Sequence, residues 1–313
     1  MALSPKRFWR KLAILAKIET DYGVDATPTG AANAIQASEV SLTPLAGEEV
    51  KRDLMLPFLG NQGSFLVGDY VELQGQVEIA GAGAAGTVPG YGVLLRACTC
   101  AETIEAGTSV TYEFTSSGEE SATLYANLDG VLHKLLGARG TATLNIAAKQ
   151  IPRFSFTVRG LLVPVVDAAL PAVTLTAFQT PLVVSKANTP TFSLHGYNAI
   201  AESLSLDFAN TIEVRNLIGE DSIQRTDRQS TGTMVLEAKS IATKDWFAIA
   251  RSHAVGALSV VHGTTAGNIV EFAAPAVQIG RPTYGNTQGI TNMSLPLMLK
   301  PVTGDDELAI IVR

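Results

Sequence analysis

The segment whose residue types and spacing most resemble a chemical motif is GAGAAG (81–86), which follows an alternating segment. In dinucleotide-binding folds, a G-x-G-x-x-G sequence after a strand lets the first turn of a helix approach a pyrophosphate. Here TVPGYG follows at once, and Pro89 and Gly90 interrupt any helix at that place. We therefore expect a flexible loop and no cofactor, and a nucleotide-binding enzyme is the least favoured interpretation.

The other potentially reactive residues form no recognisable constellation. Cys98 and Cys100 are the only cysteines, and on a strand or at its end they would share one face. Such near neighbours rarely form a disulfide, so we expect both to be reduced, and no cluster supplies further ligands for a metal. No G-x-S-x-G sequence occurs, the carboxylate pairs lie in turn-rich segments, and the histidines are scattered (His133, His195, His253 and His262). The prediction is no enzyme, although tertiary placement could still create a catalytic pair.

Composition predicts a β-rich protein that hides apolar surface against partners. The chain of 313 residues is 46% hydrophobic and 17% charged, below the roughly 25% charge of typical soluble domains. No apolar run is long enough to cross a bilayer, and large exposed apolar patches usually mark interfaces. Many Val, Thr, Gly and Pro residues favour short strands separated by turns. The net charge of −6 argues against gripping nucleic acid, but not against a role beside DNA in which adhesion would be harmful.

The second half of the sequence repeats the first in the order of its segments. Self-similarity of this kind indicates one structural unit used twice. The matching pairs are EVSLTPLAGEEVKRDL (39–54) with SLSLDFANTIEVRNLI (203–218), YVELQGQVEIA (70–80) with STGTMVLEA (230–238), YGVLLRAC (91–98) with WFAIARSH (246–253), and FSFTVRGLLVP (154–164) with TNMSLPLMLKP (291–301).

The repeat and the turn signals divide the chain into four parts. We expect an N-terminal arm over 1–38, a first β module over 39–164, an extended linker over 165–190 and a second β module over 191–313. Each module should carry one short helix, near 90–96 and 244–253. The basic start followed by LAILA is too short for a signal peptide. The arm is either frayed or docks on a neighbour through a short helix with an apolar face (Phe8, Trp9, Leu12 and Leu15).

The segment 70–78 alternates strictly and should be a half-buried strand. Its polar face carries Glu72 and Glu78 and no base, and Glu237 occupies the corresponding face in the second copy. Arg96 and Arg251 also take equivalent places in the two copies. They are either surface arginines or members of an interface ion pair that occurs twice.

The first half resembles the tail tube (major tail) proteins of long, non-contractile-tailed bacteriophages (siphophages). The residues that carry the resemblance are ETDYGVDATPTGAANAI (19–35), V-x-L-x-P-L-x-G-E-x-V-x-R (40–52), GQVEIAGAGAAGTVPGYGVLLRAC (75–98), HKLLGARGTATLNI (133–146) and P-x-F-x-F-x-x-R-G-L (152–161). The resemblance implies a mostly β fold of two tandem tail-tube-like modules, each a sandwich or small barrel with a short flanking helix. In that family such modules join edge to edge in stacked rings around an acidic channel.

The implied function is a structural virion protein that self-assembles into the tail tube and conducts DNA into the host. Glu72, Glu78 and Glu237 are then candidates for the lumen face, and Phe8, Trp9, Arg96 and Arg251 for contacts between subunits. Implied partners are other copies of the chain, the tape-measure protein and transiting DNA in the lumen, and terminator and distal tail proteins at the ends, with no membrane. The protein would reside in the virion tail, and in the host cytoplasm during assembly.

Most members of that family resemble one module per chain and form sixfold rings. Two modules per chain predict trimeric rings with pseudo-sixfold symmetry. A tail-tip or baseplate adaptor ring of the same fold is the alternative.

Overall fold

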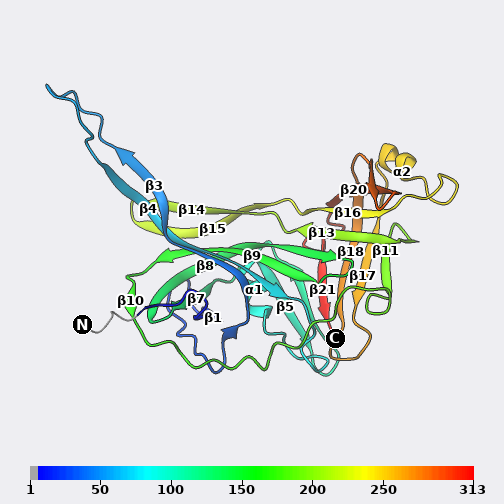
Figure 1. The fold of residues 1–313 in the computed structure, drawn as a ribbon, viewed down its shortest axis with the longest axis horizontal. Helices are drawn as coiled ribbons and strands as arrows, with labels where there is room; N and C mark the ends of the chain where they lie inside the picture. Colours follow the sequence, from blue (N-terminus) through cyan, green and yellow to red (C-terminus); the bar gives the residue numbers. More distant parts are fainter. Residues whose placement is uncertain (1–5) are drawn as a thin grey trace.

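The computed structural model describes residues 6–313 and shows an almost entirely antiparallel β protein (Figure 1). Residues 1–5 of the expected arm lie outside the described residues. Two short helices, α1 (Gly92–Ala97) and α2 (Trp246–Ser252), lie where the sequence predicts them. The mostly β fold class is thereby confirmed. Between residues 6 and 313, no helix has both the length and the apolarity needed to cross a membrane.

We call the part of the chain that ends with β10 the first module. Its strands are β1 (Leu12–Ile18), β2 (Ala34–Ile35), β3 (Ser38–Lys51), β4 (Ser64–Glu78), β5 (Cys100–Glu105), β6 (Ser109–Phe114), β7 (Ala122–Leu128), β8 (Val131–Ala147), β9 (Arg153–Leu162) and β10 (Val166–Asp167).

We call the part that begins with β11 the second module. Its strands are β11 (Thr191–Leu194), β12 (Tyr197–Asn198), β13 (Ala201–Asp207), β14 (Asn210–Leu217), β15 (Glu220–Arg228), β16 (Thr231–Glu237), β17 (Val255–His262), β18 (Val270–Ile279), β19 (Thr283–Thr287), β20 (Ile290–Leu299) and β21 (Ala309–Val312).

Strand pairing follows the same order in both modules. In the first, β3 pairs with β4, β4 with β9, β9 with β8, β8 with β7, and β7 with β1. In the second, β13 pairs with β16, β16 with β20, β20 with β18 and β19, β18 with β17, and β17 with β11. The β14–β15 hairpin corresponds to the outer parts of β3 and β4. The first module alone inserts the β5–β6 hairpin between its helix and the next strand, and the second alone adds β21.

The two modules share their sheets. β8 pairs with β13, from Thr143 with Asp207 to Ala147 with Ser203, so the sheet runs without interruption from one module into the other. β6 pairs with β21, which also pairs with β18 and thereby closes a second connection. Because the backbone groups at these edges bond to one another, neither module presents them to solvent.

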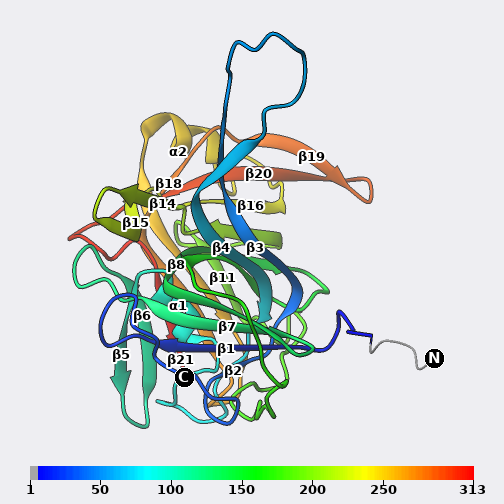
Figure 2. The ribbon, with the colours of Figure 1, turned by 90° about the vertical axis from the view of Figure 1, so that its left-hand side faces the viewer.

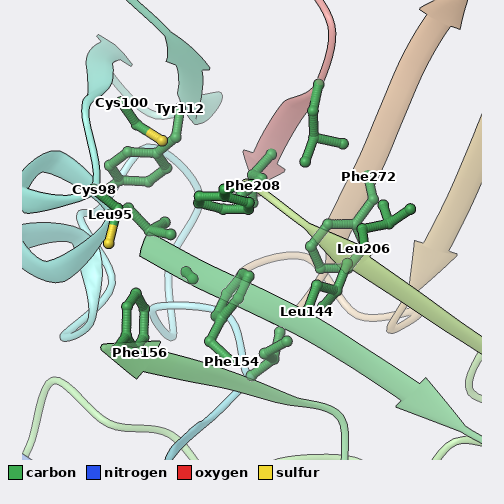
Figure 3. Packing of buried hydrophobic residues seen from close by; sticks show 14 of the residues in the cluster. Leu95, Cys98, Cys100, Tyr112, Leu144, Phe154, Phe156, Leu206, Phe208 and Phe272 are labelled. Carbon is green, nitrogen blue, oxygen red and sulfur yellow. The ribbon is translucent and has the colours of Figure 1, made fainter. Parts of the chain in front are cut away.

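One apolar core spans both modules (Figure 3). Phe154 on β9 lies 5.7 Å from Phe156 and 6.2 Å from Phe272 on β18, measured between ring centroids. Phe114 and Phe208, from different modules, meet edge to face at 5.1 Å. Aromatic pairs of this kind stabilise a core both by the apolar area that they bury and by their preferred ring geometry. Because two of these pairs join residues of different modules, the modules are packed as one body.

The structure corrects the expected N-terminal arm. The sequence leaves a frayed arm or a short docked helix as the alternatives for the residues around Leu12. In the structure Leu12–Ile18 form β1, which pairs with β7 on one side and with β2 on the other. Its residues Ala13 to Ala16 are all buried. Four consecutive buried residues suit a strand covered on both faces, whereas an amphipathic helix would expose some of them. The first module therefore begins before residue 39.

The cysteines are free and buried, but they do not share a strand. Cys98 ends α1, Thr99 adopts a positive φ of 66°, and Cys100 begins β5. Burial raises the pKa of the Cys98 thiol well above its ordinary value and that of Cys100 to about 12. Both thiols are therefore protonated near neutral pH and unreactive.

The GAGAAG loop holds the two modules together. The Gly83 N–H donates to the carbonyl oxygen of Gly267 (2.8 Å), and the Gly81 N–H donates to Asn268 Oδ1 (2.8 Å). A Cβ on Gly81 would lie 2.2 Å from the Gly267 carbonyl oxygen, and one on Gly267 would lie 2.6 Å from that of Gly83. The glycines thus allow two loops to approach each other closely.

Gly81→Ala is expected to destabilise the protein by roughly 1–3 kcal/mol, because backbone must move to accept the methyl group. Gly60→Ala is the matched control, since nothing lies within 4 Å of a Cβ there. Thermal unfolding should show a lowered Tm for Gly81→Ala alone. Equal midpoints for the two variants would contradict a packing role for the loop.

Candidate assembly surfaces

The sheet shared by the modules has one continuous polar face. Val71, Leu73 and Val77 of β4 are buried, so the predicted alternation of this strand is confirmed, and the residues between them point to the other side. The same alternation continues across β9, β8, β13 and β16. The polar face consists mainly of uncharged side chains (Gln74, Gln76, Ser155, Thr157, Thr141, Thr143, Asn145, Ser203, Ser205, Thr231 and Thr233). The Ser205 hydroxyl donates to Asn145 Oδ1 (3.1 Å) across the module junction.

Bases from the neighbouring strand, or from just beyond the end of the same strand, lie beside the acids that the sequence places on this face. Glu72 is paired in register with Arg159, whose Nε lies 2.9 Å from Glu72 Oε2, and Glu78 is paired with Arg153 at 3.5 Å. Glu237 forms an ion pair with Lys239, two residues on. The neighbouring strand β9 supplies both arginines, which inspection of the β4 segment alone misses. The face is therefore nearly neutral at these points, and its orientation toward a lumen stays a prediction.

The two arginines proposed for subunit contacts occupy equivalent places, each in the last turn of its helix. Arg96 is already engaged inside the first module: its Nε and Nη2 donate to the Glu120 carboxylate at 2.7 and 2.6 Å, and Nη1 lies 3.4 Å from Glu102. Arg251 is exposed and forms no ion pair with residues 6–313. Only Arg251 is therefore available to a second chain without breaking an existing pair.

Phe8 and Trp9 are exposed, as an interface role requires. The Phe8 N–H donates to Asp129 Oδ2 at 2.7 Å, and the Lys11 ammonium lies 5.0 Å from the centre of the Phe8 ring. The start of the described chain is thus fixed beside the β7–β8 turn. A contact of these two aromatic residues with another subunit remains a prediction.

A long hairpin projects from the molecule. The outer parts of β3 and β4 and the loop between them extend far beyond the sheet (Figures 1 and 2). Along it, large apolar side chains are exposed (Val50, Leu54, Met55, Leu56, Phe58, Leu59, Phe65 and Leu66). Exposed apolar residues gathered on one projecting element indicate a surface that a partner covers.

The corresponding hairpin of the second module is docked on the first module. Tyr22 Oη accepts a hydrogen bond from the Ile223 N–H (2.6 Å), and Arg139 Nη1 donates to the Ile223 carbonyl oxygen (3.0 Å). Arg225 Nε donates to Glu119 Oε1 at 2.9 Å. Sequence reasoning missed this contact, because its residues are about one hundred to two hundred positions apart.

The two strands at the ends of the run β3–β4–β9–β8–β13–β16–β20–β19 each keep one edge unpaired within the described part of the chain. β3 pairs only with β4, and β19 pairs only with β20. They lie at opposite ends of the same run of strands, and such edges offer unpaired N–H and C=O groups to another chain. The fold thus defines a class of protein, an antiparallel β-sheet protein whose two end strands, β3 and β19, each leave one edge unpaired.

Comparison with known families gives this class a name. The sequence profile of a family described as phage tail tube protein matches residues 9–296, nearly the whole chain. The chain belongs to this family, so it is a structural component of a phage tail tube, as the resemblance of its first half predicts. No curated protein matches the sequence significantly.

Asp305 joins the loop after β6 to the segment before β21. Its carboxylate accepts from the Ser116 N–H (2.9 Å) and hydroxyl and from Arg228 Nη2 (3.0 Å). Burial acts to raise the pKa of Asp305, but the hydrogen bonds from Ser116 and Arg228 outweigh it and hold the pKa below its ordinary value. The ionised form therefore stabilises the folded state above the pKa of the unfolded chain, and that contribution is lost as pH falls.

Asp305→Asn tests this contribution, because asparagine also tolerates the positive φ of 62° at this position. At pH 7 the variant should melt below the wild type. The difference should begin to shrink as pH falls below about 4, the pKa of aspartate in the unfolded chain, and be lost as pH falls through the lower pKa of the folded carboxylate. A difference in Tm that is independent of pH would contradict the assignment.

Proposed function

We propose that this chain forms the wall of a siphophage tail tube, in which copies self-assemble into stacked rings and conduct DNA into the host. The observation that carries the proposal is the β8–β13 junction, where two modules of the same strand order join edges into one sheet. A closed wall requires the edge strands of neighbouring modules to pair in this way at every boundary between modules. The run of strands that crosses the β8–β13 boundary ends in an unpaired edge on each side, at β3 and at β19.

Three chains would close a ring of pseudo-sixfold symmetry. If the two modules are equivalent wall segments, then a ring of three chains contains six of them, and closed cyclic symmetry gives a partner to β3 and β19 of every chain. The division into two tandem modules joined by a linker at 165–190, whose first residues pair with β8 as β10, is part of this proposal. It is supported by the repeated pairing order and by the two helices in equivalent positions.

The polar face of the shared sheet is the best candidate for the lumen. DNA must pass along the wall without being held, and a protein holds DNA mainly by clustered, unpaired Lys and Arg. On this face Arg153 and Arg159 are neutralised by Glu78 and Glu72, and most other side chains are uncharged. Glu72, Glu78 and Glu237 remain candidates for the lumen face, with pairing rather than a surplus of negative charge as the means of avoiding adhesion.

The proposed partners follow from this role. They are further copies of the chain, the tape-measure protein and DNA within the lumen, and terminator and distal tail proteins at the tube ends. The protein would reside in the virion tail and assemble in the host cytoplasm. A tail-tip adaptor ring of the same fold is the alternative, and it would stop at one ring.

Electron microscopy and native mass spectrometry of the purified chain test the assembly. The expected result is long hollow tubes at high concentration, and trimers as the ring unit on dilution. Single rings that never stack would favour the adaptor. Rings of six chains with the second module outside the wall would contradict pseudo-sixfold closure.

Glu78→Lys tests the lumen face. Because the new ammonium group would lie beside Arg153, it would create a positive site that retains DNA, whereas Glu78→Gln removes the acid without adding a base. Tubes should form with both variants, and phage carrying the lysine substitution should deliver DNA more slowly, with relief at higher salt. Loss of ring formation by the lysine variant would instead place Glu78 in an interface.

A further inference from the structure

The internal repeat gives the open edge of the second module a direct counterpart within the chain. Gly75 and Gly232 are equivalent in sequence, and they pair with Phe156 on β9 and Leu297 on β20. This structural register is shifted by four residues from the sequence match of 154–164 with 291–301, and it is the structural register that relates β19 to β8. Arg153 lies three residues before Phe156 and pairs with Asn145 on β8. Ser294 lies three residues before Leu297 and pairs with Thr283 on β19. β19 therefore occupies the position of the end of β8, which is the part of β8 that pairs with β13.

We propose that the junction between neighbouring copies repeats this internal junction. β19 of one copy pairs with the start of β3, at Ser38, in the next, because Ser38 pairs with Gln76 as Ser205 pairs with Thr233. The base of the β3–β4 hairpin packs on the second module of the first copy. The inference rests on the proposed function and names the surfaces that join its subunits.

The edge formed by β19 lacks the features that usually protect a strand edge from pairing with another chain. Its sequence TYGNT contains no Lys, Glu or Pro, the residues by which free edges are usually protected, and all five residues are exposed. By the correspondence with β8, Asn286 occupies the position of Ala148. The Ala148 N–H donates to the Glu202 carbonyl oxygen at 2.9 Å, as the last bond of the β8–β13 junction. The Asn286 N–H is thus the equivalent donor toward a second copy.

The hairpin base supplies the second half of the junction. Leu66 precedes Gly75 by as many residues as Ile223 precedes Gly232. Ile223 is 0% exposed against the first module, whereas Leu66 is 53% and the adjacent Phe65 57% exposed. The apolar residues at the base of the long hairpin therefore lack the cover that the short hairpin already has inside the chain.

The second module offers a matching surface at the corresponding end of its sheet. In the internal junction, Arg159 Nη1 donates to the Ile212 carbonyl oxygen at 3.0 Å and thereby holds the short hairpin. The same correspondence of registers places Lys300 where Arg159 stands in the first module. Beside it, Met298 is 39% exposed on the same sheet. A cation and an apolar side chain are thus available to the hairpin of the next copy.

Asn286→Pro tests the edge, because proline removes the outward N–H and is tolerated on a free edge strand. Asn286→Ala is the matched control: both variants lose the hydrogen bond from the Gly289 N–H to Asn286 Oδ1, and only proline loses the donor. Native mass spectrometry should show trimeric rings for alanine and monomers for proline at the same concentration. Rings formed equally by both would overturn the edge pairing.

Leu66→Glu tests the hairpin base, with Leu59→Glu at the fully exposed tip as control. Burial of an unpaired carboxylate should raise the concentration needed for rings about tenfold or more, with no such change for the tip variant. Equal effects of the two variants would overturn the packing of the base. Circular dichroism checks folding; if the proline variant does not fold, the Leu66 pair decides. Failure of the wild type to form any ring would instead refute the proposed function.

Discussion

The arrangement of the whole structure follows from one constraint: the backbone N–H and C=O groups at a strand edge must form hydrogen bonds with a partner. Inside the chain, β8 supplies these hydrogen bonds to β13, and β6 supplies them to β21. The two modules therefore form one sheet with one core. At the two ends of the run of strands that crosses the β8–β13 junction, β3 and β19 each keep one edge unpaired within the described residues. A free edge tends to recruit further strands. The fold contains one completed junction between modules, and we propose that β3 and β19 are the two halves of the next one.

The pairing of charged side chains on the polar face is the second constraint. The glutamates of β4 form their ion pairs with arginines of the neighbouring strand β9. Glu72 and Glu78 are separated by the same interval as Arg153 and Arg159, and the antiparallel register of β4 and β9 brings each acid opposite a base. Cross-strand pairs of opposite charge stabilise a sheet and leave little net field on its surface. A wall of this kind can be wet and polar while it neither attracts nor strongly repels a polyanion.

Much of the fold could be predicted from the sequence, because alternation in β4, the positions of the two helices and the repeated order of segments are local signals. The sequence also shows that the two glutamates and the two arginines are equally spaced. It does not show that they form pairs, because that depends on the register between β4 and β9. The strand β1 was mistaken for an arm because burial on both faces removes the alternation. Contacts such as Arg225 with Glu119 could not be foreseen, since they depend on how the second module folds back onto the first.

The central claim is that the junction between chains repeats the junction between modules. A reconstruction of the wild-type tube by electron cryo-microscopy tests it most directly. The account predicts three chains per ring, with β19 of each chain hydrogen-bonded to β3 of the next and the polar face continuous around the lumen. A ring in which these two edges do not meet, or in which the second module lies outside the wall, would contradict it.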